Sequence, residues 1–355
     1  MNWPPSLQLI ASKELGGAER WFQRFVKELA SEHAPTTVGI RAGSALETLD
    51  FGGLPVHRLP FLSVWDPWSR HAVTRWVRES RPALVQTYLG RATRLTRTRG
   101  RAVHLARLGG YYPLGPYRHA DGWIGNTRAL CDWLIAQGLP ATRVYHIYNF
   151  AAPIVECSQA ELETLRATLD LPPDAWLLLA LGRFVPVKGH RYLIEALARL
   201  PRRLAEREWR LLLLGDGPLR PTLVRCAEQL KIASRIHWAG WQADPGPYLQ
   251  LADVVVFPSL EAETLGNVIL EAWRAARPLL TTRFRGAREL VRHGEDAWTV
   301  PCADAVALAQ AIVYLLHDER LCARLVRQGT ARVATEFSPA SIMAQYRALY
   351  RDWVG

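Results

Sequence analysis

The stretch WLLLALGRFVPVKGH (176–190) starts as an apolar run and turns at a glycine into a basic loop. Such a run, ended by a turn signal, is typical of a strand that is buried on both faces of a parallel sheet. Gly182 permits a sharp exit from the strand, and Arg183 and Lys188 then follow five residues apart. Two cations at the carboxyl end of a strand suit a diphosphate leaving group, because they neutralise the charge that grows as its bond breaks. An ordinary basic loop is the alternative when this motif is taken alone.

Similar apolar runs recur along the whole chain and alternate with helical patterns, which predicts an α/β architecture with parallel sheets. The runs form two series, and a polar stretch near 155–175 separates them. We therefore expect an α/β domain at 1–154, a second one at 155–337 and a C-terminal helix at 338–355. The expected strands are 7–11, 82–88, 102–108, 122–126 and 144–150 in the first series, and 176–182, 211–217, 235–240, 253–259 and 278–283 in the second. The expected helices include 18–30, 190–200 and 264–276.

A second motif, EAETLGNVILEA (261–272), follows one of these strands. It places Glu263 in the loop after the strand and Glu271 two turns into the next helix. A carboxylate before the helix suits sugar hydroxyls, and one further along it suits ribose hydroxyls. A capped amphipathic helix with exposed acidic residues is the alternative reading of this spacing alone. The expected start of the helix offers N–H groups that suit a phosphate, those of Leu265, Gly266 and Asn267.

Composition excludes several classes of protein. No apolar run in the 355 residues approaches the roughly 18 that a membrane span needs, so we expect no integral membrane protein. The N-terminus MNWPPSLQLIASKE has prolines where a signal peptide needs an apolar helix. The five cysteines form no C-x-x-C pair, so we expect reduced thiols in a cytoplasmic protein, without a zinc site or disulfide framework.

Three absent motifs narrow the chemistry further. The chain has no D-x-D sequence, so we expect no metal on the diphosphate, with Arg183 and Lys188 in place of the cation. It has no G-x-x-x-x-G-K-[ST] sequence, which argues against an ATPase. In GDGPLR (215–220), arginine stands where a nicotinamide-binding G-x-G-x-x-G motif has its third glycine. We therefore expect neither a metal nor a cofactor.

Together the two motifs closely resemble those of the retaining glycosyltransferases of family 4, which have the GT-B fold. The resemblance covers most of the chain, and it implies two Rossmann-like α/β domains facing a central cleft, with the C-terminal helix crossing back to the first. It implies that the first domain binds the acceptor and the second the nucleotide-sugar. It also implies that Arg183 and Lys188 bind the diphosphate, Glu263 faces the transferred sugar and Glu271 holds the ribose.

Further matches to the family extend along the chain as GGAERW (16–21), GWIGNT (122–127), GDGP (215–218) and RIHWAGW (235–241). In the family, the loop that contains Gly16 and Gly17 here approaches the donor phosphates. The segment that starts at His237 here borders the nucleobase. These residues complete the expected donor-binding set.

One departure from the family lies in HLARLGGYY (104–112), where many members have a histidine just before a glycine. Arg107 and its neighbours stand in that place here. His104 lies too early, and we expect it to be a core residue whose hydrogen bonds are satisfied. The sequence offers Arg107, Tyr111 and Tyr112 as acceptor-side candidates and does not choose among them.

Basic residues are concentrated in one part of the chain, whose formal net charge is +11. Residues 70–119 contain eleven arginines and a single acidic residue, Glu79, for a net charge of +10. We therefore expect an acidic partner here, and the acceptor side of the GT-B fold fits an anionic glycolipid or a membrane surface. Nucleic acid is not expected, because no motif with interleaved exposed aromatic residues accompanies the arginines.

A helical pattern at the start of this basic segment has an apolar face opposite Arg70, Arg75 and Arg78. We expect this helix to pack its tryptophans on the sheet. The alternative is a helix whose tryptophans lie in the interface of an anionic membrane. The apolar face consists of Trp68, Ala72, Val73, Trp76 and Val77.

The expected function is transfer of a hexose-type sugar from a nucleotide diphosphate donor, preferably a UDP-sugar, with retention of configuration. The expected acceptor is a cell-envelope glycolipid or polysaccharide such as a lipopolysaccharide core. We expect a cytoplasmic enzyme, with peripheral binding to the inner membrane face as an additional option. The alternatives are a GDP-mannose-dependent mannosyltransferase and a non-catalytic protein that binds nucleotide-sugars or nucleic acid.

Overall fold

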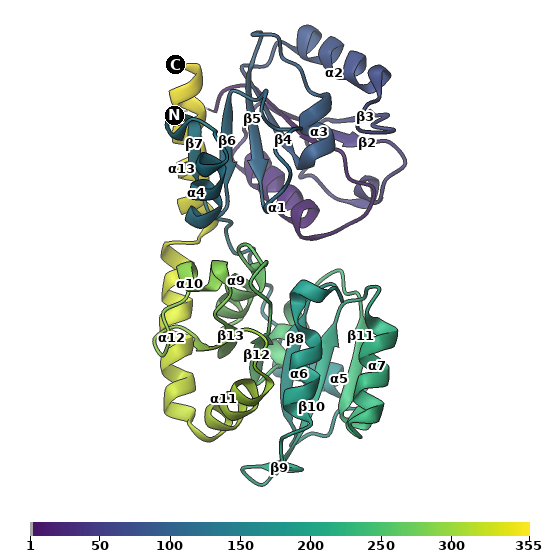
Figure 1. The fold of residues 1–355 in the computed structure, drawn as a ribbon, viewed down its shortest axis with the longest axis vertical. Helices are drawn as coiled ribbons and strands as arrows, with labels where there is room; N and C mark the ends of the chain where they lie inside the picture. The colour runs from purple at the N-terminus through teal and green to yellow at the C-terminus, as the bar shows by residue number, and fades with distance from the viewer. Residues whose placement is uncertain (1–2) are drawn as a thin grey trace. The chain divides into compact units, whose positions relative to one another are not determined.

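The computed structural model describes residues 3–355, which form two compact units (Figure 1). Unit 1 runs to Asn149 and resumes at Pro339–Gly355, whereas unit 2 is Phe150–Ser338. The sequence analysis placed this boundary a few residues later, at 155. Each unit contains one parallel sheet with helices packed against it, which confirms the α/β class.

Unit 1 has seven parallel strands in the order β3-β2-β1-β4-β5-β6-β7. The first strand, β1, lies inside the sheet. Strands β2 and β3 lie on one side of it, and β4 to β7 lie on the other. The order therefore reverses between β1 and β4, and such a switch point is where open α/β sheets bind ligands. The strands are β1 (Ser6–Ile10), β2 (Thr36–Arg41), β3 (Val56–Leu59), β4 (Leu84–Tyr88), β5 (Val103–Leu108), β6 (Gly122–Gly125) and β7 (Val144–His146).

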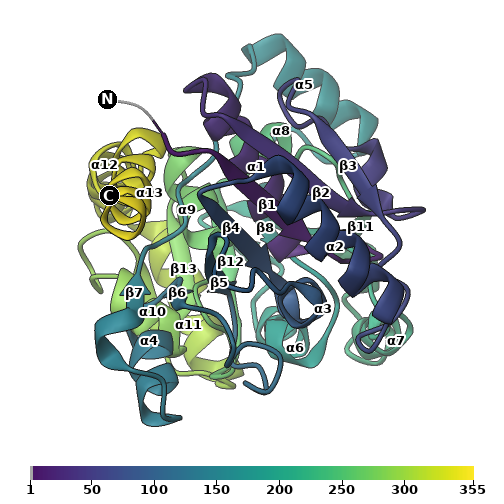
Figure 2. The same ribbon diagram turned by 90° about the horizontal axis from the view of Figure 1, so that it is seen from above.

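The helices of unit 1 bury apolar faces against this sheet. On α1, for example, Trp21, Phe22 and Phe25 are buried at helical spacing. Helices α2 and α3 lie side by side (Figures 1 and 2). The helices are α1 (Gly17–Ser31), α2 (Pro67–Ser80), α3 (Leu89–Leu95), α4 (Arg128–Ala136) and α13 (Pro339–Val354), with 3₁₀ turns at Ala45–Thr48 and Ala141–Arg143.

The C-terminal helix α13 is an integral part of unit 1. Its Tyr346 and Tyr350 are fully buried, and the Tyr350 hydroxyl donates a hydrogen bond to Gln86 over 3.0 Å. Arg347 of the same helix forms an ion pair with Glu32 at the end of α1. Polar bonds at both ends of a buried aromatic stripe fix the register of the helix on the sheet.

Helix α2 packs Trp76 on the core of the sheet, as expected, but not Trp68. Its buried residues are Ser69, Val73 and Val77, which are spaced four apart and define the inward face. Trp68 is one position away from Ser69, so its side chain is turned by about 100° from that face and is exposed. Trp76 is only half-buried. The expectation was therefore wrong for Trp68.

Unit 2 repeats the strand order of unit 1, as β11-β10-β8-β12-β13-β14, all parallel. The switch point lies between β8 and β12. A short strand, β9 (Arg203–Leu204), pairs with β10 in the antiparallel direction. The parallel strands are β8 (Trp176–Leu181), β10 (Arg207–Leu214), β11 (Ile236–Gly240), β12 (Val254–Phe257), β13 (Leu279–Thr282) and β14 (Trp298–Val300).

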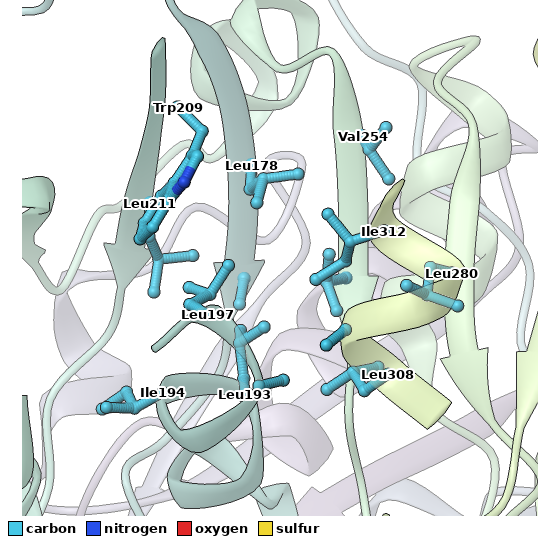
Figure 3. Close-up of a cluster of buried hydrophobic side chains, with 14 of the residues drawn as sticks. Leu178, Leu193, Ile194, Leu197, Trp209, Leu211, Val254, Leu280, Leu308 and Ile312 are labelled. Carbon is cyan, nitrogen blue, oxygen red and sulfur yellow. The ribbon is translucent and has the colours of Figure 1, made fainter. Parts of the chain in front are cut away.

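The core of unit 2 is almost entirely aliphatic. Figure 3 shows part of it, with Leu178 of β8 and Leu211 of β10 among side chains such as Leu197 and Ile312 from two covering helices. The helices are α5 (Gln159–Thr168), α6 (His190–Leu197), α7 (Arg220–Gln229), α8 (Gly246–Leu251), α9 (Asn267–Arg274), α10 (Arg285–Leu290), α11 (Ala305–His317) and α12 (Glu319–Thr335), with 3₁₀ turns at Pro186–Lys188 and Ala233–Arg235.

The ten strands expected from sequence all exist, although that expected at 144–150 ends at His146. The strands β2, β3, β9 and β14 were missed. Within residues 3–355, no helix is long and apolar enough to cross a membrane. The five cysteines are free thiols, of which Cys131 is buried.

Candidate active site

At the switch point of unit 2, the loops that follow β8 and β12 lie against each other. The backbone N–H of Leu260 donates a hydrogen bond to the carbonyl of Val187 over 2.7 Å. A Cβ added to Gly189 would lie 2.0 Å from the carbonyl oxygen of Pro258, and Gly189 has φ +65°. Only glycine allows this contact, because any side chain would clash with backbone and strain the left-handed conformation.

This contact brings the two sequence motifs together through one ion pair. Lys188 Nζ lies 2.7 Å from Glu263 Oε2, and the two side chains are only 21% and 14% exposed. Ser259 Oγ donates to the same carboxylate oxygen over 3.3 Å, and the Lys188 ammonium lies 5.1 Å from the ring centroid of Phe257. A partly buried pair of this kind is costly to break by removing one partner, because the other charge is left uncompensated.

The neighbouring helix α10 holds the loop that carries Glu263. Arg288 donates two hydrogen bonds to the carboxylate of Glu261, over 2.9 and 2.5 Å. These bonds lower the pKa of Glu261 below its usual value. A Cβ on Gly286 would lie 1.7 Å from the carbonyl oxygen of Thr264, so the helix touches the loop backbone directly.

Glycines also bring the ends of β8, β10 and β11 together. The N–H of Gly182 donates to the carbonyl of Leu214 over 2.9 Å, and the N–H of Gly215 donates to that of Gly240 over 2.7 Å. A Cβ on Gly215 would lie 2.1 Å from the carbonyl oxygen of Gly182. The GDGP segment therefore acts here as a close backbone contact beside the basic loop.

The positive charges of the basic loop belong to Arg183 and Lys188. Arg183 is exposed on the loop. His190, which begins α6, is buried, and burial followed by the Lys188 ammonium lowers its pKa to about 3. Its imidazole is therefore neutral near pH 7 and adds no charge to the loop.

Helix α9 begins later than expected. Gly266 caps it with φ +77°, and a Cβ there would lie 2.6 Å from the ring of Phe257. Leu265 and Gly266 consequently precede the helix, whose first residue is Asn267. Glu271 is the fifth residue of the helix. It therefore lies just over one turn from the helix start, whereas two turns were expected.

Unit 1 has different residues at its corresponding switch point. After β1, the chain reaches Gly16, which is extended and caps α1 without a side chain, and then Gly17. A Cβ on Gly16 would meet only the carboxylate of Glu19, at 3.0 Å. Glu19 is itself buried. The loop that was expected near the donor phosphates thus stands at the carboxyl edge of its own sheet.

The acceptor-side candidates of unit 1 differ in accessibility. Arg107 on β5 is only 4% exposed, and its Nε donates to the hydroxyl of Tyr346 over 3.0 Å. Its guanidinium also bonds Asn149 and lies 4.7 Å from the ring centroid of Trp21. Arg107 is therefore enclosed by residues of unit 1, and an acceptor would have to displace these contacts to reach it.

The two tyrosines after β5 are half-buried and held by aromatic contacts. Tyr111 packs edge-on against Trp133 with centroids 5.4 Å apart, and Tyr112 stacks on Tyr117 at 6.4 Å. His104 is buried and hydrogen-bonds Thr87 over 3.0 Å, which confirms that it is a satisfied core histidine.

Comparison with known proteins identifies the family. A family model described as "Glycosyl transferases group 1" matches residues 176–318. Lipopolysaccharide core biosynthesis glycosyltransferase LpsE of Rhizobium meliloti is 33% identical over 338 residues, which cover 94% of this chain and 95% of that protein. The chain belongs to the group 1 glycosyltransferases. LpsD of the same organism, a lipopolysaccharide core biosynthesis glycosyltransferase, is 30% identical over 340 residues, with 94% and 95% covered.

Solved structures show that this glycosyltransferase has the GT-B fold, as the sequence resemblance implied. Anabaena Alr3699/HepE, in complex with UDP and glucose, superimposes with a TM-score of 0.87 over 98% of this chain and 100% of that one, at 23% identity. WaaG, a glycosyltransferase involved in lipopolysaccharide biosynthesis, gives a TM-score of 0.72 over 97% and 99%, at 18% identity.

Among the residues expected in the donor site of this glycosyltransferase, the structure joins Lys188 and Glu263 by direct contact. His237 is half-buried and pairs with Leu212 along β11, before the carboxyl end of that strand. Among residues 3–355, no group of three His, Cys, Asp or Glu side chains is placed to hold a metal ion.

Sequence reasoning missed the residues that support the loop. Ser259 contacts Glu263 directly, and the pair of Glu261 and Arg288 spans 27 residues of chain. Gly286, at the start of the short helix that carries Arg288, was a signal that this helix packs closely on another segment. No spacing rule predicts a contact between two residues that are this far apart in the sequence.

Proposed function

We propose that this glycosyltransferase moves a hexose from a UDP-sugar to a cell-envelope glycolipid or polysaccharide such as a lipopolysaccharide core, with retention of configuration. The ion pair between Lys188 and Glu263 at the switch point of unit 2 carries this proposal. The relatives LpsE and LpsD, named for lipopolysaccharide core biosynthesis, support the acceptor class. The complexes of Anabaena HepE with UDP and with UDP-glucose support the donor class.

In this proposal, donor binding exchanges the partners of the ion pair. The diphosphate takes the Lys188 ammonium, with Arg183 beside it, and the hexose hydroxyls donate hydrogen bonds to the Glu263 carboxylate. The ammonium thus keeps an anionic partner and the carboxylate keeps hydrogen-bond donors, so neither is left buried and alone. The first N–H groups of α9, starting at Asn267, add a favourable partial positive charge for the phosphates.

The chemical step needs stabilisation of the leaving group. The bond from the anomeric carbon to the phosphate oxygen breaks, and a bond from the same carbon to the acceptor oxygen forms. The acceptor hydroxyl proton passes to an oxygen of the departing UDP. Arg183 and Lys188 stabilise the negative charge that develops on UDP, and they take the role that a metal ion has in other transferases. Glu271 binds the ribose hydroxyls.

A thermal-shift panel tests the donor class, with UDP, GDP, ADP, UDP-glucose and GDP-mannose added separately to the full chain. A ligand held at 100 times its dissociation constant stabilises the protein by about 2.7 kcal/mol, which raises the melting temperature measurably. The proposal expects a rise with UDP and UDP-glucose. A rise with GDP and GDP-mannose alone would instead indicate a mannosyltransferase, and no rise with any of them would contradict the proposed donor class.

A further inference from the structure

The segment between β3 and α2 exposes an unusual amount of apolar surface. We call Leu62, Val64, Trp65 and Trp68 the apolar tip; their exposed fractions are 64%, 39%, 71% and 77%. Single exposed apolar residues are common, but four within seven positions, two of them tryptophans, form a patch of the kind that marks an interaction site.

Polar contacts beneath the apolar tip hold it outward. The buried carboxylate of Asp66 accepts hydrogen bonds from the N–H of Leu62 over 3.2 Å and from the N–H of Trp68 over 3.0 Å. Arg91 donates to the carbonyl of Phe61 over 3.2 Å, and Phe61 is fully buried. These hydrogen bonds fix the backbone of the tip in a turn, and its apolar side chains are exposed and not packed in the core.

Arginines lie beside the tip. The guanidinium of Arg94 lies 3.9 Å from the ring centroid of Trp65. Burial first, and then the charges of Arg70 and Arg94, lower the pKa of Arg97, so these three arginines are close enough to repel one another. We call them the arginine rim. Asp66 under the tip offsets only one of these three positive charges, and Glu79 is paired with Arg75 over 2.7 Å, so the rim keeps a net positive charge.

We propose that the apolar tip and the arginine rim dock unit 1 on an anionic membrane surface. Tryptophan and leucine side chains are stabilised at the boundary of headgroups and acyl chains, and arginines beside them pair with lipid phosphates. Nucleic acid would supply phosphates but no apolar phase for the tip. A second copy of the chain, bound through the same patch, would bring the two arginine rims face to face.

The position of this surface indicates how an acceptor would reach unit 1. This one part of the inference rests on the proposed function. A Cβ on Gly90 of α3 would lie 3.5 Å from the hydroxyl of Tyr117, and one on Gly115 would lie 3.8 Å from Arg94. The rim therefore adjoins the loop that carries Tyr111 and Tyr112. Docking would bring a membrane-held glycolipid acceptor to the acceptor-side candidates, whereas docking itself needs no transferase activity.

Sedimentation with vesicles tests the proposal on the full chain. Vesicles of phosphatidylcholine alone are compared with vesicles of equal parts phosphatidylcholine and phosphatidylglycerol, at low and high salt. We expect binding to the anionic vesicles that weakens with salt. The double variant Trp65→Ser/Trp68→Ser should bind at least about tenfold more weakly, because two buried indole groups are lost. Its matched control is Tyr314→Ser, which changes an aromatic side chain of unit 2 that is 46% exposed on α11.

A second pair of variants tests the arginine rim. Arg70→Ser/Arg94→Ser should lose about tenfold in affinity for anionic vesicles. Arg324→Ser/Arg327→Ser removes the same charge from exposed positions on α12 and should leave binding unchanged. Circular dichroism checks that each variant is folded, and UDP binding to the same samples should stay normal. If the wild-type chain binds UDP normally but does not bind anionic vesicles, docking is overturned while the proposed function stays in place.

Other results would also overturn the proposal. Vesicle binding that both the tip variant and the rim variant retain would place the membrane contact elsewhere. An equal loss of vesicle affinity in Arg324→Ser/Arg327→Ser would show that binding depends on the net charge of the chain and not on the arginine rim. A dimer in sedimentation equilibrium that the tip variant dissociates, without vesicle binding, would assign the patch to a second copy. Retention of single-stranded DNA that depends on Arg70 and Arg94, again without vesicle binding, would assign it to nucleic acid.

Discussion

The two units share the strand order of their sheets but differ at the switch point. In unit 2, the loops at this point bring Lys188 to 2.7 Å from Glu263, and Gly189 packs against backbone. In unit 1, the corresponding point has Gly16 and Gly17 above the buried Glu19. The same topology thus offers two crevices, and only the side chains decide which of them has paired charges for a nucleotide-sugar.

The largest expected effect separates sugar contact from nucleotide contact in unit 2. Glu263→Gln should lower the rate of sugar transfer by about 100- to 1,000-fold, because in the proposed function the carboxylate contacts the transferred hexose. UDP affinity should stay within a few-fold of wild type, since Lys188 then has no competing partner. UDP release from the donor, with lipopolysaccharide as acceptor, gives the rate.

Glu195→Gln is the matched control for this variant, because Glu195 is also ion-paired on unit 2, with Arg191 over 2.7 Å. It should transfer sugar normally. Equal losses of transfer and UDP binding in Glu263→Gln would remove Glu263 from the sugar subsite.

Much of this comparison could be predicted from sequence. Strands such as β8 and β10 are buried on both faces, so their apolar runs were unmistakable. The strands β2 (TTVGIR) and β3 (VHRL) were missed because both contain polar residues, and β3 is also a four-residue strand at the edge of the sheet. The start of α9 was misplaced because packing of Gly266 on Phe257, a contact between distant elements, holds the preceding residues out of the helix.

Glycine substitution contrasts the two switch points by stability. Gly189→Ala should destabilise unit 2 by about 1–3 kcal/mol, because the new methyl group would meet the Pro258 carbonyl. Gly16→Ala should cost less than about 1 kcal/mol, since it changes only a helix cap without a side-chain bond. Urea unfolding measures both. Gly294→Ala has a similar φ of +75° with open space around it, so it reports the backbone strain alone. A cost for Gly189→Ala no larger than this control would contradict the close contact.

Buried histidines predict a second difference between the two units, in how strongly their stability depends on pH. Burial lowers the pKa of His104 to about 3 and that of His119 to about 4, while unit 2 has His190, at about 3. The unfolded chain binds these protons near pH 6.5, so stability is complete above that pH and falls as the pH drops towards these values. Each histidine should cost on the order of 2 kcal/mol at about pH 5.

Thermal unfolding at about pH 7.5 and pH 5 measures this loss. His104→Gln should reduce the difference between the two pH values, whereas His71→Gln, at an exposed position of α2, should leave it as in wild type. An unchanged difference in His104→Gln would contradict the assignment of the acid sensitivity to this residue.

The smallest expected effect concerns the nucleoside. Glu271→Gln should weaken UDP binding by about tenfold, which corresponds to one charged hydrogen bond to the ribose. Uridine monophosphate should lose affinity by the same factor, because it contains the same ribose, and isothermal titration measures both ligands. Glu289→Gln, on α10, is the matched control. Full affinity of Glu271→Gln for both ligands would move this residue out of the donor site.

Contacts within the site were less predictable than its place. The motifs placed Lys188 and Glu263 at one sheet edge, yet nothing in their spacing shows that the two side chains form an ion pair. The bond of Arg288 to Glu261 joins separate elements and depends on the fold. Trp68 shows the opposite failure, since its apolar character suggested the core, whereas its position beside Ser69 on α2 turns it to solvent.

The central claim is that the Lys188 ammonium leaves Glu263 to bind the diphosphate of the donor. Isothermal titration of UDP into wild type, Lys188→Gln and Lys231→Gln tests it most directly, because Lys231 is an exposed lysine of the same unit that lies before β11, away from the switch point. We predict that Lys188→Gln weakens UDP binding by about 100-fold or more and that Lys231→Gln binds as wild type does. Equal UDP affinity in all three proteins would contradict the account.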